Sequence, residues 1–251
     1  MFKKLLRVIL FILLGIMLFF GAVLLFPKVS PQQELVPPKI MPVRQLDSLY
    51  WAMQMDVLKK EFGNHKTLLP GYELQTLLAL RYFPELKNVR INFLYKKAFI
   101  PLSSRPNLFT MFGAQKNWEF RVIVSSESTE SMEPILMKNL PFDAQIAILA
   151  HEIAHTEHYQ KYGFWQLLKF GLMYAISSEF RATHERSTDE SVIYHGLGWQ
   201  LFEYAKFVRT DPEAAPHYEN MKDFLDKNYL TPTEIMQVMT RIQSYGLNAP
   251  Y

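Results

Sequence analysis

An uncharged apolar run near the amino terminus, residues 8–26, constrains this chain more than any other feature. It reads VILFILLGIMLFFGAVLLF. As a helix, these 19 residues span about 28 Å, close to the roughly 30 Å hydrocarbon core of a bilayer. Lys3, Lys4 and Arg7 precede the run, so residues 1–26 are expected to form a cytoplasmic tip and a single-pass transmembrane helix that contacts the lipid bilayer. The rest of the chain is then expected outside the cytoplasm, in the periplasm or extracellular space if the chain is bacterial.

A cleaved signal peptide is the alternative interpretation of the same run. Signal peptides usually have a shorter apolar region that ends at a small-residue cleavage site, whereas this run ends in Leu25-Phe26-Pro27-Lys28. An uncleaved anchor is therefore favoured. Five prolines between residues 27 and 42 predict an extended, semi-rigid linker. The folded domain is expected over residues 43–251.

The charge and cysteine content exclude several classes of protein. Lys3, Lys4 and Arg7 account for the whole excess of 27 basic over 24 acidic residues. The rest of the chain is balanced, so no nucleic-acid partner is expected. The chain has no cysteine, which excludes disulfide scaffolds, thiolate zinc sites, iron–sulfur clusters and cysteine nucleophiles. The oligomeric state stays open.

Apolar periodicity predicts an α+β, mainly helical domain with a small sheet. Strands are expected over residues 89–99 and 119–125, with a loop over 101–117 between them. Thr231 and Glu234 form a capping box at the start of the last helix. The segment 143–150 is apolar almost all round, so its helix is expected to be buried. Helices are expected over residues 45–62, 70–80, 143–162, 164–195, 199–208, 218–227 and 232–244.

Two histidines and a glutamate interrupt this buried helix, in the order His151-Glu152-Ile153-Ala154-His155. Because the histidines are four residues apart, both rings project from one helical face, as two ligands of a tetrahedral zinc ion do. Glu152 can take a proton from a water that the metal activates, so it is the candidate general base. The alternative is a chance match, but burying these side chains without partners would cost several kcal/mol. The sequence therefore predicts one Zn²⁺ per chain.

A third protein ligand is expected about thirty residues downstream. Glu185 and Asp189 are four residues apart on a predicted helix, so they share a face. Glu185 can complete a site of two histidines and one glutamate. Asp189 can accept a hydrogen bond from the distal N–H of a ligating histidine and fix its orientation. The alternative is a charged helix face with ordinary salt bridges, such as Glu185 to Arg181.

Other polar residues near the two motifs are weaker candidates. His184 and Glu190 are reserve third ligands. His158 is seven residues after His151, which places it about 10 Å further along the helix axis. One ion cannot easily bind all three histidines, so His158 is expected at the surface.

The two motifs together resemble the gluzincin metallopeptidases, in particular the family of HtpX and the CAAX prenyl proteases. Leu149-Ala150-His151-Glu152-Ile153-Ala154-His155 is similar to the LxHExxH of that family, and Glu185-Arg186-Ser187-Thr188-Asp189 to its ExxxD. The resemblance covers roughly residues 119–207 and departs at Thr188, where alanine is usual. It implies a zincin-like domain that hydrolyses peptide bonds, with His151, His155 and Glu185 as zinc ligands and Glu152 as general base. It also implies that the strand over 119–125 holds an extended peptide or protein substrate. The physiological role that the resemblance implies is processing or quality control of envelope proteins.

Two further points stay open in the sequence. Oxyanion stabilisation needs a cation or a histidine, and His195, Arg181 and Tyr194 are candidates. The simpler interpretation of His195 is a residue at a helix C-terminus, before Gly196. Residues 164–180 form either a core helix or an amphipathic surface that enters the bilayer.

Two other functions are compatible with the same motifs. The first is a zinc hydrolase that acts on non-peptide amides or esters. The second is a catalytically inactive binding module with a structural zinc, although such a site has no use for the Glu152 carboxylate.

Overall fold

A computed structural model describes residues 9–11, 14–15, 17–19, 21–23 and 25–247 of the chain. The fold is α+β and mainly helical, with one small sheet, as the sequence predicts. The helices are α2 (Ser48–Met53), α3 (Met55–Phe62), α4 (Glu73–Arg81), α5 (Phe142–Tyr159), α6 (Phe164–Ile176), α7 (Ser178–Val192), α8 (Gly198–Thr210), α9 (Ala215–Asn228) and α10 (Pro232–Thr240). The strands are β1 (Lys66–Thr67), β2 (Arg90–Lys96), β3 (Leu102–Pro106) and β4 (Glu119–Ser125). Short 3-10 and π turns connect them.

The sheet is mixed and has the order β1-β2-β4-β3. β2 pairs in parallel with β1 and β4, whereas β3 pairs antiparallel with β4. The loop predicted over residues 101–117 is therefore wrong in part, because β3 lies within it. Its sequence, LSSRP, has little strand propensity, and it becomes a strand through its pairing with β4. β3 forms an edge of the sheet.

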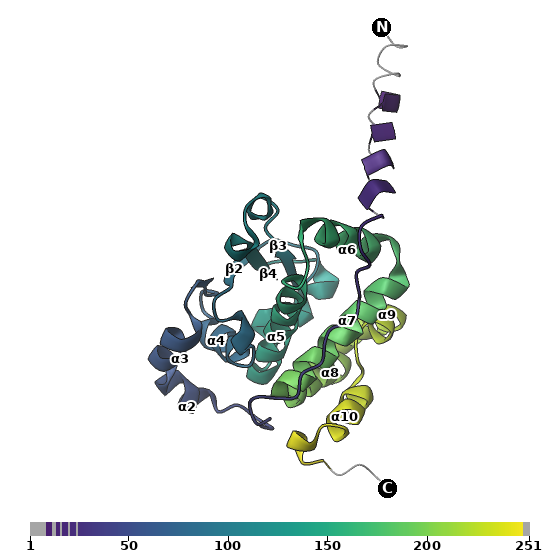
Figure 1. Cartoon of the computed structure of the whole chain (residues 1–251). Helices are drawn as coiled ribbons and strands as arrows, with labels where there is room; N and C mark the ends of the chain where they lie inside the picture. Colours follow the sequence, from purple (N-terminus) through teal and green to yellow (C-terminus); the bar gives the residue numbers. More distant parts are fainter. Residues whose placement is uncertain (1–8, 12–13, 16, 20, 24, 248–251) are drawn as a thin grey trace.

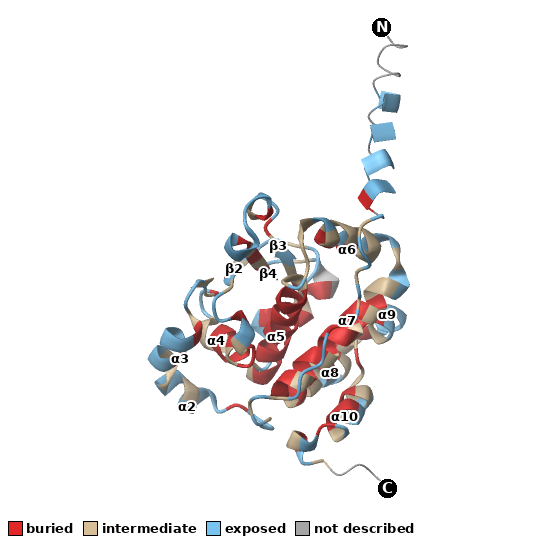
Figure 2. Ribbon diagram, viewed as in Figure 1, coloured by how far each residue is buried: buried red, intermediate tan, exposed pale blue. Residues whose placement is uncertain are grey.

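Helix α5 runs through the middle of the domain (Figure 1). It contacts β3 and α4 on one side and α7 and α8 on the other. Every residue from Asp143 to His158 is buried, and α5 forms the centre of the buried region (Figure 2). This confirms the burial predicted from its apolar sequence.

Most predicted helices are present, but two of them are divided. The helix predicted over residues 45–62 is α2 and α3, which meet at Gln54. The region predicted over 164–195 is α6 and α7, because the Ser177 hydroxyl accepts a hydrogen bond from the backbone N–H of Phe180 and starts a new helix there. The capping box of Thr231 and Glu234 at the start of α10 is confirmed.

The segment 27–42 has no helix or strand, and it lies against the domain rather than apart from it. The backbone N–H of Gln33 donates to Ser187 Oγ (2.6 Å), and the Gln33 side chain is buried. His158 Nε2 lies 3.0 Å from the backbone oxygen of Ser30. These contacts hold the linker along α7 and α5 (Figure 1).

The membrane helix predicted over residues 8–26 falls in part on positions outside the described residues. Among the residues that are described, no helix is long and apolar enough to cross a membrane. The described side chains of this run are mostly exposed, Phe11 and Met17 at 71% each.

Candidate metal centre

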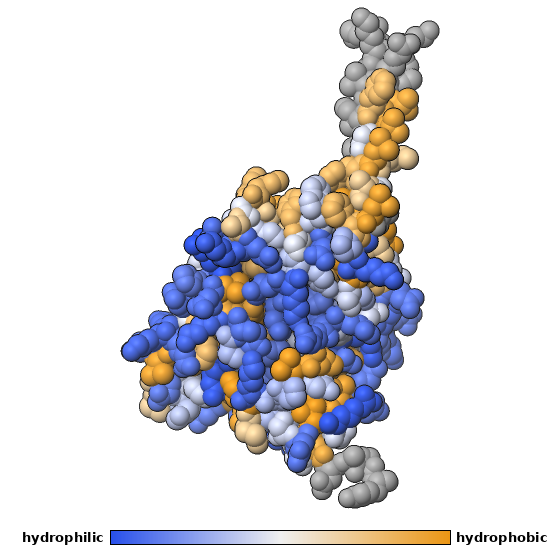
Figure 3. All heavy atoms as spheres, in the orientation of Figure 1, coloured by the Kyte–Doolittle hydropathy of each residue, from blue (hydrophilic) through white to orange (hydrophobic). Residues whose placement is uncertain are grey.

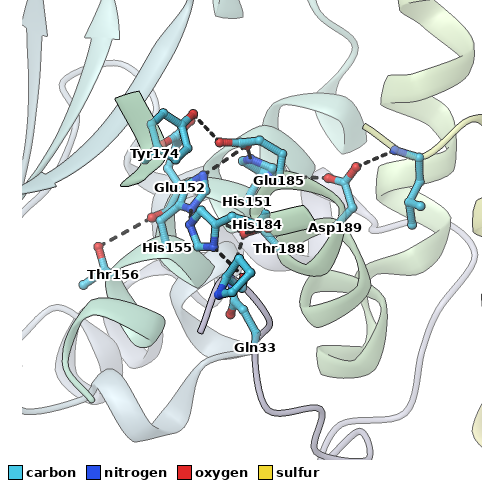
Figure 4. Close-up of polar contacts among 12 residues, drawn as sticks. Gln33, His151, Glu152, His155, Thr156, Tyr174, His184, Glu185, Thr188 and Asp189 are labelled. Carbon is cyan, nitrogen blue, oxygen red and sulfur yellow. Dashed lines mark hydrogen bonds and ion pairs between the residues drawn. The ribbon is translucent and has the colours of Figure 1, made fainter. Parts of the chain in front are cut away.

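Helices α5 and α7 bring three buried side chains together at the centre of the domain (Figure 4). His151 and His155 lie one turn apart on α5, and Glu185 faces them from α7. One ligand atom from each of the three lies within 4.8 Å of the others. All three residues are buried, so this cluster is close enough to bind a metal ion.

The distances within the cluster fit a small tetrahedral ion. Glu185 Oε2 lies 3.0 Å from His151 Nε2 and 3.4 Å from His155 Nε2. Two ligands on a tetrahedral zinc ion are about 3.3 Å apart when each metal–ligand distance is about 2.0–2.1 Å. The three donors therefore converge as ligands of one ion would. Burial opposes ionisation of Glu185, but His155 and His151 hold its pKa well below the usual range, so the carboxylate form is favoured.

Asp189 orients His151 from behind the cluster. Asp189 Oδ1 lies 2.9 Å from His151 Nδ1, on the ring edge opposite the nitrogen that faces Glu185. Its second oxygen accepts a hydrogen bond from the backbone N–H of Leu230 (2.8 Å). His151 Nδ1 then carries the proton and Nε2 is left to bind a metal. Burial opposes protonation of the ring, yet Asp189 and Glu185 raise the pKa of His151 well above its usual value while no metal is present.

His184 orients His155 in the same way. His155 Nδ1 lies 2.9 Å from His184 Nε2, and His184 Nδ1 lies 3.0 Å from the backbone oxygen of Pro31. A carbonyl can only accept, so His184 Nδ1 donates to Pro31 and its Nε2 accepts from His155. His155 Nε2 is then free for a metal. Burial, with His155 beside it, keeps the pKa of His184 well below its usual value, which suits this neutral ring. Gln33 and Thr188 extend the network (Figure 4).

Glu152 lies beside the cluster with one oxygen unused. Its Oε2 is buried and has no hydrogen-bond partner among the described residues. Burial raises the pKa of the Glu152 carboxyl. The nearby His155 and His151, and a hydrogen bond from the backbone of Ser104 on β3, oppose this in part. On another side of the cluster, the Tyr174 hydroxyl of α6 donates a hydrogen bond to Glu185 Oε1 (2.5 Å). Such a carboxylate can accept a proton inside the site, and no side chain of the described chain competes for Oε2.

The structure places His195 away from this cluster. Its Nδ1 donates to the backbone oxygen of Ser191 (2.7 Å), one turn earlier, as expected of a histidine near the end of α7. Its Nε2 lies 3.2 Å from Glu85 Oε1 and 3.7 Å from Glu157 Oε2, which makes a separate group of three. Within the described part of the chain, none of its hydrogen bonds or ion pairs is to His151, His155 or Glu185, so the contacts give no support to a role in oxyanion stabilisation.

Several other candidates lie outside the group of three ligands. His184 stands behind His155 rather than among the three ligands, and Glu190 lies outside the cluster. Arg181 donates to the backbone oxygen of Tyr174, and within the described part of the chain it forms no ion pair with Glu185. The prediction that His158 lies at the surface is wrong, because it is 2% exposed: the linker and Phe170 cover it.

The strand beside the cluster is β3, not β4. β4 pairs with β2 on one side and β3 on the other, so its backbone groups are used and it cannot hold a peptide as predicted. β3 is the edge strand, with no further strand on its outer side among the described residues, and the Ser104 hydroxyl forms a hydrogen bond with Thr156 on α5 (2.9 Å), one turn after Glu152.

Comparisons with known protein families, with curated proteins and with solved structures found no match to this chain.

Proposed function

We propose that this protein is a membrane-anchored, zinc-dependent endopeptidase. The observation that supports it most is the buried convergence of His151, His155 and Glu185 beside a carboxylate, Glu152, that has an oxygen free. A purely structural metal site needs no such carboxylate. The choice of zinc over other metals rests on the ligand set of two imidazoles and one carboxylate. The zincin-like class rests on the sequence motifs.

The residues of the chain have distinct roles in this proposal. His151, His155 and Glu185 hold the ion, whose chemistry when bound is to polarise a carbonyl and make water more acidic. Glu152 accepts a proton at Oε2 from the attacking water and passes it to the amine that leaves. Asp189 and His184 keep the two imidazoles in the required tautomer. The edge strand β3 aligns an extended substrate by backbone pairing.

Metal content and turnover test the proposal together, on the full chain in detergent. We expect about one zinc per wild-type chain, loss of zinc in Glu185→Ala, and full retention in Glu179→Ala, an exposed carboxylate on the same helix. Glu152→Gln should keep the zinc but lose cleavage of casein. Absence of zinc from the wild type would refute the metal site. Zinc without casein cleavage would instead favour a hydrolase of non-peptide amides or esters, or an inactive binding module.

The membrane part of the proposal concerns residues 8–26, with the tip before them in the cytoplasm and the domain outside. Its support is the uncharged sequence and the exposure of the described side chains of the run. The chain has no cysteine, so an exposed Leu49→Cys variant gives one labelling site on the domain. A membrane-impermeant maleimide should label it on intact spheroplasts. Labelling only after lysis would refute the orientation.

A further inference from the structure

An apolar surface surrounds the point where the N-terminal run joins the domain. Trp165 on α6 stacks on Phe26 (5.2 Å between ring centroids) and contacts Phe164 (5.1 Å). Phe164 in turn contacts Phe112 (5.5 Å), in the connection between β3 and β4. We call this surface the apolar platform; it consists of Phe26, Leu108, Phe109, Phe112, Phe164 and Trp165. Figure 3 shows hydrophobic residues at the end of the domain from which the N-terminal run emerges.

The β3–β4 connection, residues 107–118, exposes two of its aromatic rings although other residues anchor it to the domain. Its Met111 and Trp118 are buried, and the Trp118 indole N–H donates to the backbone oxygen of Gly113 (3.1 Å). Phe109 and Phe112 nevertheless remain 86% and 79% exposed. Two phenylalanines exposed to water in an anchored loop do not stabilise the fold. Contact with an apolar phase outside the protein accounts for their exposure.

We propose that the apolar platform enters the same lipid surface as residues 8–26. We choose lipid rather than a protein partner because the apolar platform is continuous with the N-terminal run: ring contacts connect Phe26, at the end of the run, to Phe112 without a break. A hydrogen bond also attaches the end of the run to α6, since Lys169 donates to the backbone oxygen of Phe26 (2.7 Å). Neither α6 nor the connection over residues 107–118 contains an aspartate or a glutamate, and each carries a lysine. Aromatic rings beside lysines, without carboxylates, suit the interface of a bilayer with anionic lipids.

The position of the apolar platform also constrains the substrate; this inference rests on the proposed function. Ser104 on β3 lies beside Glu152, and Leu108 of the apolar platform follows four residues later. β3 ends at Pro106, so the distance is no more than the roughly 13 Å that a fully extended chain covers in four residues. A peptide paired with β3 is then cleaved close to the lipid surface, which points to protein segments just outside the bilayer as substrates.

Spin-label accessibility tests the lipid contact without any need for catalysis. Phe109→Cys and Phe112→Cys each give the cysteine-free full chain one nitroxide site, and Leu49→Cys on α2, 78% exposed, is the control. Each variant is reconstituted in vesicles of phosphatidylcholine and phosphatidylglycerol. Collisions with oxygen, relative to those with a water-soluble nickel chelate, should be several-fold more frequent at 109 and 112 than at 49.

Two outcomes would overturn the proposal. Equal accessibility ratios at all three sites would mean that the platform stays in water. Protection from both oxygen and nickel would mean that a protein partner or a second copy covers it. The same measurement on a Glu152→Gln background should give the same ratios, so failure of the lipid contact is separable from failure of the proposed peptidase activity.

Discussion

The substitution Asp189→Asn tests whether the network behind His151 controls the metal centre. The carboxylate accepts two hydrogen bonds, from His151 Nδ1 (2.9 Å) and from the backbone N–H of Leu230 (2.8 Å). Asparagine has the same shape but only one acceptor oxygen. Its NH₂ group must then face either the imidazole N–H or the backbone N–H, donor against donor.

The expected magnitude follows from those two contacts. Loss of one hydrogen bond to a charged group costs about 1.5–3 kcal/mol, and here the site is buried. The metal-free variant should be destabilised by about that amount. Loss of the partner of a ligating imidazole lowers metal affinity about 10–100-fold, which corresponds to about 1.4–2.8 kcal/mol.

Two measurements on the full chain check this reasoning. Zinc affinity is measured by competition with a chromophoric chelator, and stability by thermal unfolding in EDTA. Asp223→Asn, an exposed residue on α9, is the control and should change neither. A variant that loses stability but keeps wild-type zinc affinity would show that Asp189 is only structural. A variant unchanged in both would refute the two hydrogen bonds.

Three further predictions concern other residues. His184→Leu leaves the His155 Nδ1–H without its acceptor and should weaken zinc binding about 10–100-fold, measured by the same competition. Burial raises the pKa of Asp143 to about 6, so the folded state keeps this proton longer than the unfolded state does. Stability relative to Asp143→Asn should therefore be greatest below about pH 4, fall as the pH rises towards 6, and level off above it, in thermal unfolding from pH 3.5 to 7.5. Gly196 has φ +98°, and a Cβ there would lie 2.9 Å from a backbone oxygen of the linker. Gly196→Ala should cost about 1–3 kcal/mol in denaturant unfolding, whereas Gly171→Ala, in open space on α6, should cost nothing.

The local sequence was sufficient to predict the features that depend on residue spacing along one helix. The i, i+4 spacing puts His151 and His155 on one face of α5, and Glu185 and Asp189 on one face of α7. The apolar composition of α5 predicts its burial for the same reason, because a helix without a polar face needs neighbours on all sides. These features depend on residues within a few turns of each other, so a single sequence contains them.

Contacts between distant segments decided the rest. β3 has a polar sequence and becomes an edge strand only because β4 lies beside it. In the sequence, His184 is one more candidate ligand. The fold places it between His155 and the carbonyl of Pro31, which is 153 positions earlier in the chain. His195 likewise meets Glu85 across 110 positions. Pairing of this kind depends on tertiary packing, which a periodic pattern does not encode. The sequence by itself determined the ligand types and their helical faces; the tertiary structure decided which polar residues stand behind them and which strand borders the site.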